Sequence, residues 1–282
     1  MSADKQQARS ALLAVRSAFP RGHSSAGQRL GCTLPPLQEE GAGAAAGGSS
    51  PAMNAPRHPP TTLSIAVAFD LICPWCLIGG RHLATAMAQL REERPDVQVA
   101  VEWRSTPLIP GTPLEGLPYR AFYVARLGSP QAVAMRQAQV RAAAQEAGLT
   151  LALERIETFP STLLAHRLVR FAREQQGAGA ASRLVESLFT RYFVQGQDIG
   201  DAGVLREALS ACGIATPGGE HAALHHDLEW LPALDDGPEA SLRGATGVPH
   251  FVFDGTQAAA GAVPPAALLR AMYRALARSV DA

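Results

Sequence analysis

Two cysteines separated by two residues are the part of this chain whose residue types and spacing most directly suggest chemistry. Cys73 and Cys76 enclose Pro-Trp in a CPWC motif, where an apolar stretch, Leu63 to Phe69, gives way to a helical pattern beginning near Leu77. Thiols at this spacing can close into a disulfide. If Cys73 lies in the first helical turn, unpaired backbone N–H groups and the helix dipole favour its thiolate, the form that attacks disulfides. The motif therefore predicts a redox-active dithiol.

Composition narrows the class of protein that could carry this dithiol. The chain has 282 residues, of which 47% are hydrophobic, and 25 basic residues balance 25 acidic ones. A globular protein with a substantial core is expected, without the basic field that attracts nucleic acid or anionic lipid. No apolar run approaches the roughly 18 residues of a membrane span. We therefore expect no nucleic-acid or membrane partner, and a cytoplasmic location.

The remaining cysteines do not suggest a second reactive site. The four cysteines of the chain are too few and too scattered for the disulfide framework of a small secreted protein. We therefore interpret Cys32 and Cys212 as residues without a redox role. A zinc half-site is the alternative for the CPWC pair. No second CxxC accompanies it, and His225 and His226 lie in an unrelated helical region, so we expect no metal.

The first 60 residues differ in composition from the rest. They lack sustained periodicity and are rich in Gly, Ala, Ser and Pro around residues 41–60, which predicts a disordered N-terminal extension. Met53 lies just before the first predicted strand, so the upstream segment is either a misplaced start or an amphipathic targeting peptide around Ala8 to Arg21. The first interpretation is favoured.

The rest of the chain predicts an α/β domain interrupted by helices. Residues 63–69 and 97–103 read as strands joined by a helix, and strand character returns at 250–253 and more weakly at 257–260, before a last helix. These elements predict a four-stranded mixed sheet formed by residues 61–110 and 236–282.

Between the two halves of this domain, residues 111–235 are predicted to form an all-helical insertion. Ser129-Pro130 resembles a helix cap and first turn, Gly148 a stop, and Asp201 the cap of a short helix. No convincing strand appears before about residue 250.

These features together resemble the DsbA family over about residues 61–282. The resemblance rests on CPWC after a strand, a long helical insertion, and Gly247-Val-Pro249 before the late hairpin. More narrowly, DLICPWCLIG at 70–79 and YFVQGQDI at 192–199 are similar to FrnE-type cytoplasmic dithiol oxidoreductases. The resemblance implies a thioredoxin-like fold with a large helical insertion, and thiol–disulfide oxidoreductase or isomerase activity on protein or small-molecule thiols and disulfides.

For the two cysteines, the resemblance implies separate roles. Cys73, the more exposed, attacks a substrate disulfide, and Cys76 beneath it displaces the product; the reverse steps oxidise a substrate dithiol. The Cys73–Cys76 pair then needs no further cofactor, although glutathione is a candidate co-substrate. The reduction potential decides the direction.

The resemblance also assigns residues around the dithiol. Pro249 is implied to be cis and to face the cysteines, leaving the backbone of Val248 available to an extended substrate. His250, next to it, is a candidate for proton transfer near neutral pH, or an inert strand residue.

Three residues of the motif itself have candidate roles in tuning or binding. Pro74 can begin the helix and tune the thiolate, and Trp75 could shield the sulfur or contact substrate, or simply pack. Asp70 could exchange a proton with Cys76 or shift its pKa, or only cap backbone N–H groups.

Two further functions stay open. Glutathione-dependent chromene-carboxylate isomerases and kappa-class glutathione transferases are similar in having a helical insertion, but their pattern has Ser in place of the first cysteine. A chaperone-like module could instead bind unfolded proteins through an apolar surface around Trp75 and Pro249, without redox turnover.

Overall fold

A four-stranded mixed sheet forms the centre of the molecule. The structure is a computed structural model, and it describes residues 61–215 and 245–280. The strand order is β2–β1–β5–β6. The strands are β1 (Thr61–Phe69), β2 (Val97–Ser105), β5 (His250–Phe253) and β6 (Gln257–Ala260). The four strands predicted from the sequence are thus confirmed, and the chain has the expected thioredoxin-like fold.

Strand pairing explains how the two distant halves form one sheet. β1 runs parallel to β2, with Phe69 opposite Ser105, and antiparallel to β5, with Ala68 opposite His250. β6 adds to β5 as an antiparallel hairpin. Because β5 begins where β1 ends, the segment just before His250 lies at the same edge of the sheet as the segment just after Phe69.

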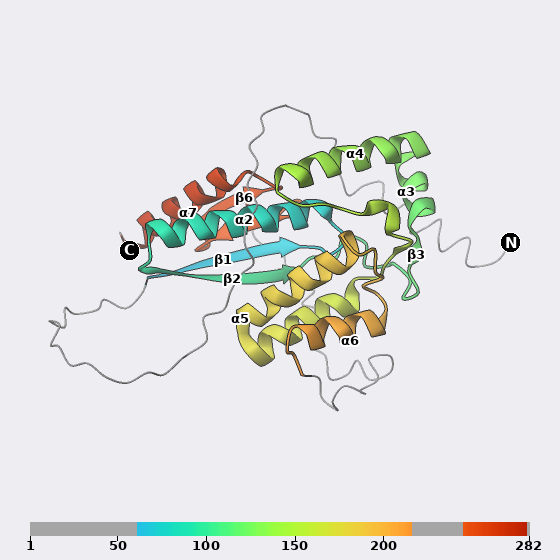
Figure 1. Ribbon diagram of the computed structural model, residues 1–282. Helices are drawn as coiled ribbons and strands as arrows, with labels where there is room; N and C mark the ends of the chain where they lie inside the picture. Colours follow the sequence, from blue (N-terminus) through green and yellow to red (C-terminus); the bar gives the residue numbers. More distant parts are fainter. Residues whose placement is uncertain (1–60, 216–244, 281–282) are drawn as a thin grey trace.

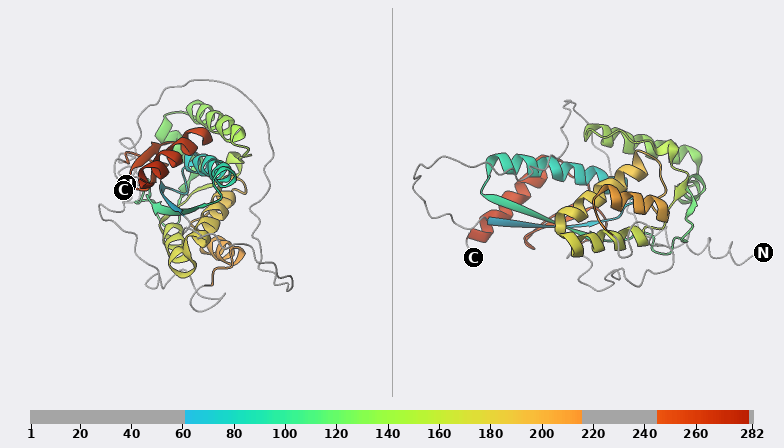
Figure 2. Two further views of the ribbon diagram at one scale, coloured as in Figure 1. Left: turned by 90° about the vertical axis from the view of Figure 1, so that its left-hand side faces the viewer. Right: turned by 60° about the horizontal axis from the view of Figure 1, so that its bottom comes forward.

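Helices cover both faces of this sheet, as Figures 1 and 2 show. On one face lie α2 (Pro74–Glu93) and α7 (Pro265–Val280), which pack against each other. On the other lie α5 (Leu163–Phe193), which packs on β2, and α6 (Ala202–Ala211). α2 begins three residues earlier than its apolar pattern predicts, because Pro74 is accommodated in the first turn, where its missing N–H has no intrahelical partner to lose.

The insertion begins with a helical pair beyond the end of the sheet. It consists of α3 (Tyr119–Leu127) and α4 (Pro130–Glu146), which pack together, and α4 also contacts α2 (Figure 1). The predicted cap is confirmed, because Ser129 Oγ accepts a hydrogen bond from Ala132 N at 3.1 Å. After α4 the chain passes through a short 3-10 helix, Leu153–Arg155, before reaching α5.

The expectation of helices alone between residues 111 and 235 was wrong in one detail. Two short strands, β3 (Leu117–Pro118) and β4 (Thr158–Phe159), pair antiparallel within the described part of the insertion. Strands of two residues are too short to produce an alternating pattern, so the sequence carried no signal for them. The boundary predicted at 235/236 and the extension 1–60 lie outside the described residues.

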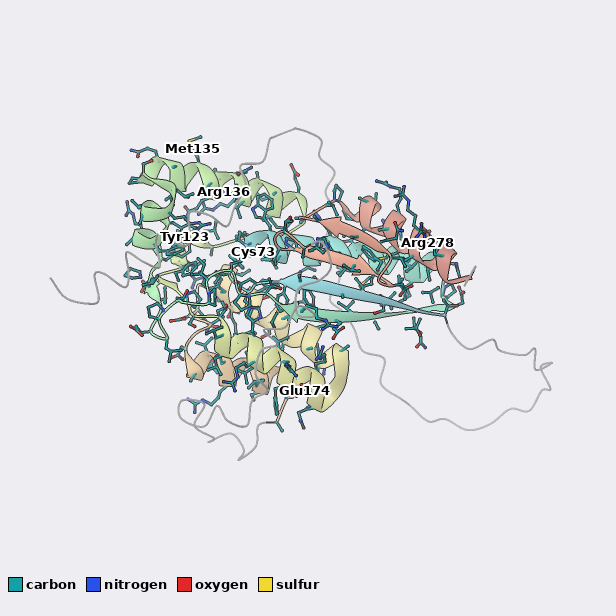
Figure 3. All side chains as sticks on the ribbon, turned by 180° about the vertical axis from the view of Figure 1, so that it is seen from behind. Cys73, Tyr123, Met135, Arg136, Glu174 and Arg278 are labelled. Atoms are coloured by element: carbon teal, nitrogen blue, oxygen red, sulfur yellow. The ribbon has the colours of Figure 1, made fainter. Side chains whose placement is uncertain are left out.

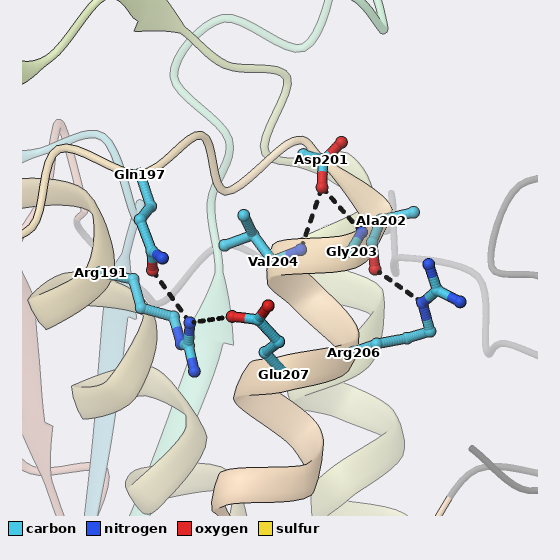
Figure 4. A network of polar contacts seen from close by, with 8 residues as sticks. All are labelled: Arg191, Gln197, Asp201, Ala202, Gly203, Val204, Arg206 and Glu207. Atoms are coloured by element: carbon cyan, nitrogen blue, oxygen red, sulfur yellow. Dashed lines mark hydrogen bonds and ion pairs between the residues drawn. The ribbon is translucent and has the colours of Figure 1, made fainter. Parts of the chain in front are cut away.

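A polar network joins α5 to α6 through the YFVQGQDI segment (Figure 4). Arg191 Nη1 donates to Gln197 Oε1 at 2.9 Å and pairs with Glu207 Oε2 at 3.1 Å. Asp201 Oδ1 accepts from the backbone N–H groups of Gly203 and Val204, which confirms the predicted cap. These contacts hold the segment between α5 and α6 in place where it leaves the end of α5.

Close packing holds α2 against the loop that precedes β5. A Cβ atom added at Gly79 would lie 3.0 Å from Pro249 Cγ and 3.1 Å from Phe251 Cζ. At the next position, Gly80, the nearest such atom belongs to Trp103 at an ordinary 3.5 Å. Glycine at 79 therefore lets the helix approach Pro249 more closely than a side chain would allow.

We expect Gly79→Ala to lower the free energy of unfolding by about 1–2 kcal/mol, because overpacking outweighs the gain in helix propensity. Gly80→Ala is the matched control, in which propensity alone should leave stability unchanged or raise it by up to about 1 kcal/mol. Urea unfolding of both variants measures the difference. Equal stability of the two variants would contradict the packing argument.

Candidate active site

The CPWC motif lies at the turn from β1 into α2. Cys73 is the N-cap residue of α2, in extended conformation, and Pro74 is in the first turn. Cys73 N donates to Asp70 O at 3.1 Å, and Cys73 O accepts from Cys76 N at 3.0 Å and from Leu77 N at 3.4 Å. The cysteine thus stands where the helix presents its unpaired N–H groups, as the sequence predicted.

Both thiols are buried, and neither is in a disulfide. Cys73 is 3% exposed and Cys76 1%, so the expected difference in exposure is small. Burial raises the pKa of the Cys76 thiol well above its usual value, and the adjacent Cys73 sulfur adds to the rise. A backbone hydrogen bond from Asp70 opposes it, while the Asp70 carboxylate adds a smaller increase. Cys76 is therefore a neutral thiol at neutral pH, and must lose a proton before it can attack.

The loop before β5 faces the dithiol from across the sheet edge. The Val248–Pro249 peptide bond is cis, as the resemblance implied. Cys73 Sγ donates to the carbonyl oxygen of Val248 at 3.8 Å, a contact between residues 175 positions apart. Pro249 O accepts from Gly261 N at 2.8 Å, which ties the loop to the β6 end of the hairpin. The fold thus brings together the two segments that the sequence predicted as a site.

A histidine on α2 strengthens this junction. His82 Nδ1 donates to Val263 O at 2.9 Å, so α2 is bonded to the segment that follows β6. Burial lowers the pKa of His82, although hydrogen bonds to the backbone of Val263 and Ala262 oppose the change. A mostly neutral His82 suffices for this bond, since one protonated ring nitrogen can donate.

Asp70 lies at the base of the site and is fully buried. Its Oδ2 accepts from Leu108 N at 2.7 Å, and its Oδ1 accepts from His166 Nε2 at 3.0 Å. His166, in the first turn of α5, is also fully buried, and its ring meets Phe69 edge-on. The carboxylate therefore accepts a backbone N–H from a distant segment, and not from the strand-to-helix turn where one interpretation had placed such a cap, and it also has a buried ionisable partner.

His166 is the residue near the dithiol that sequence reasoning missed. It lies 96 positions from Asp70, in a buried stretch of α5 that also includes Leu168 and Val169, where a histidine looks like a core residue. Among the described residues, its Nδ1 has no hydrogen-bond partner although it is buried. Only the fold, by laying α5 under the end of β1, reveals the pair.

Two aromatic residues, Trp75 on α2 and Tyr123 on α3, lie near the CPWC motif. Trp75 is half-buried and packs on the core, with the Arg136 guanidinium 5.7 Å from its ring centre. Tyr123 on α3 lies against Tyr119 with the two rings tilted at 57° and their centres 4.7 Å apart. Figure 3 shows Cys73, Tyr123 and Arg136 at the same end of the molecule. Trp75 is thus placed where it could contact a substrate.

The other candidates are less closely connected. His250 is 5% exposed and lies in β5 opposite Ala68. Cys212 follows α6, and burial raises its pKa. Cys32, His225 and His226 lie outside the described residues. In the described ranges no three His, Cys, Asp or Glu side chains are grouped as a metal site would need, and no helix is long and apolar enough to cross a bilayer.

Comparisons with known proteins agree with this geometry. The family model for the DSBA-like thioredoxin domain matches residues 64–273. A probable DsbA oxidoreductase from Streptomyces coelicolor is 27% identical, with a TM-score of 0.64 over 76% of this chain and 90% of that one. A search of curated protein sequences gave no match.

Two more distant structures were also matched. A putative protein disulfide isomerase from Nitrosomonas europaea is 15% identical, with a TM-score of 0.49 over 77% of this chain and 98% of that one. The cytosolic disulfide reductase DsbM from Pseudomonas aeruginosa is 19% identical, with a TM-score of 0.47 over 77% and 97%. The family model covers well over half of the sequence, so the chain belongs to the DsbA-like thioredoxin-domain family of thiol–disulfide oxidoreductases.

Proposed function

We propose that the protein exchanges dithiols and disulfides through Cys73 and Cys76. The observation that carries this proposal is the 3.8 Å contact between Cys73 Sγ and the carbonyl of Val248, which precedes cis-Pro249. It puts the first cysteine of a CxxC motif at a helix N-terminus and beside a backbone segment that can pair with an extended chain.

The reaction follows from the two positions. The Cys73 thiolate attacks one sulfur of a substrate disulfide, whose S–S bond breaks, and the departing thiolate takes a proton. The Cys76 thiol then loses its proton and attacks Cys73 Sγ, which forms the Cys73–Cys76 disulfide and releases the second substrate thiol. The substrate gains two electrons and the enzyme loses two. A thiol such as glutathione would restore the dithiol, and an oxidant would drive the reverse direction.

Asp70 is the proposed proton acceptor for Cys76. Because burial keeps Cys76 neutral, a nearby base speeds the second step. Leu108 N and His166 Nε2 each occupy one carboxylate oxygen, so they hold the group in position. His166 acts through Asp70 and is therefore a positioning residue.

Val248, Trp75 and Pro249 form the proposed substrate-binding surface. The carbonyl of Val248 and the half-buried Trp75 flank Cys73 from two elements, the loop before β5 and the first turn of α2. Backbone pairing tolerates many sequences, which suits an enzyme acting on protein or small-molecule thiols and disulfides. The sparse cysteines favour the cytoplasm as the proposed compartment.

Replacing the nucleophile tests the proposal directly. We expect Cys73→Ser to abolish reduction of insulin disulfides, because the serine hydroxyl forms no thiolate, while the fold is retained. Cys76→Ser should accumulate the mixed disulfide, which mass spectrometry detects. Cys212→Ser is the control and should keep full turnover. Unchanged turnover in Cys73→Ser would remove the proposal, and glutathione transfer that survives Cys76→Ser would favour the glutathione-dependent alternative.

A second prediction concerns the base. Asp70→Asn keeps an acceptor for Leu108 N but loses the charge, so the rate of mixed-disulfide resolution should fall by roughly a hundredfold at pH 7. Because the pKa of Cys76 is raised, its thiolate forms unaided only at higher pH, and the gap from wild type should narrow as pH rises. Stopped-flow measurements across pH, with circular dichroism as a folding check, measure this. A gap independent of pH would make the role of Asp70 purely structural.

A further inference from the structure

The α3–α4 pair carries an excess of positive charge that the whole chain does not share. Residues 119–146 contain four arginines and one glutamate, although basic and acidic residues balance over the full sequence. The glutamate, Glu146, ends α4 about 15 Å along the helix from Arg136, given a rise of 1.5 Å per residue. Arg141 is neutralised by Glu154 at 2.7 Å. The positive charge is therefore concentrated toward the turn between α3 and α4.

Arg136 brings part of this charge to the CPWC motif. It is exposed, and its guanidinium lies over the Trp75 ring, two residues from Cys73. Its Nη1 donates to Gln139 Oε1 at 2.9 Å, which leaves other N–H groups of the five on a guanidinium for a ligand. No carboxylate in the part of the chain that the structure describes is paired with Arg136. Figure 3 shows neighbouring Met135, which is 75% exposed, pointing away from the site.

Arg126 adds a second cation near the first. It is half-buried at the end of α3, and burial lowers its pKa, with the positive charge of Arg136 contributing in the same direction and Tyr123 opposing. Burial has the opposite effect on Tyr123, whose pKa it raises. The Cys73 sulfur adds to this rise, and Arg126 and Arg136 oppose it. Arg126, Arg136 and Tyr123 thus share one electrostatic environment with the Cys73 sulfur.

We propose that Arg136, supported by Arg126, selects thiol and disulfide substrates that carry a carboxylate close to the reacting sulfur. The inference rests on the proposed function and adds its substrate class. The guanidinium lies 5.7 Å from the centre of the Trp75 ring, two residues along the chain from Cys73, where it can pair with a carboxylate of an incoming substrate. An acidic residue next to a peptide cysteine and the carboxylates of glutathione offer this same chemistry. Cationic substrates would meet like charge and react more slowly.

Two disulfide peptides of equal length test the proposal, one with Glu and one with Lys on both sides of cysteine, with oxidised glutathione as a third substrate. Reduced wild-type protein should react faster with the Glu peptide at low salt, and 0.5 M NaCl should reduce the preference, because exposed charges are screened. Arg136→Gln should weaken the preference by about threefold to fivefold. Arg136→Lys keeps the positive charge but loses the planar guanidinium, so its preference for the Glu peptide should lie between those of wild type and Arg136→Gln.

Arg120→Gln is the matched control, because it removes the same charge from an exposed position of the same helical pair without a contact to Trp75. It should leave the preference unchanged. If Arg136→Gln changes neither the preference between the two peptides nor the rate with oxidised glutathione, the inference is overturned while exchange stays intact. If the wild-type protein reacts with none of the three substrates, the proposed function is overturned instead. If Arg136→Gln slows only the reaction with oxidised glutathione, the carboxylate recognised by Arg136 is that of the small thiol. If it changes only the rates with the peptides, the carboxylate recognised is that of a protein substrate.

Discussion

The antiparallel pairing of β1 with β5 is the constraint on which the site depends. It places His250 opposite Ala68, and so brings the cis-Pro249 loop to the residue that begins α2. Without that register, the carbonyl of Val248 and the sulfur of Cys73, 175 positions apart, would not meet. Gly79 and His82 hold the same junction from α2, one by allowing close approach and the other by bonding Val263 O. The insertion can be long because the sheet, and not the connection, fixes this geometry.

Both cysteines are buried, but they occupy different positions in α2. Cys73 has the helix N-terminus and the cis-proline loop around it, whereas Cys76 lies inside the helix with a pKa raised by loss of water. A neutral thiol must lose its proton to react, and the proposed acceptor, Asp70, is hydrogen-bonded to His166. A buried pair is costly to desolvate and contributes little net stability, which is compatible with the proton-accepting role proposed for Asp70.

The sequence contained most of this arrangement, but not all of it. The CPWC motif, its place after a strand, and the paired strands of the hairpin follow from local pattern, and the family resemblance implied the cis bond at Pro249. His166 could not be found in this way, because helical spacing identifies the face a residue lies on without identifying its partner. The sequence did not predict the β3–β4 strand pair, because strands of two residues show no alternating pattern. Arg136 reads as one exposed arginine until the fold places it over Trp75.

In the proposed exchange reaction, the insertion supplies side chains that can discriminate between substrates, which the thioredoxin-like half lacks near Val248. Backbone pairing at the Val248 carbonyl is indifferent to side chains, so a site built from the sheet edge alone would discriminate poorly. Helices α3 and α4 approach the same sulfur from outside the sheet and bring side chains, among them Tyr123 and Arg136, that can discriminate by charge and shape. Discrimination requires an unfavourable contact for the wrong substrate as well as a favourable one for the right substrate. In the proposed selection, the guanidinium beside Trp75 would supply both, because one charge attracts carboxylates and repels ammonium groups.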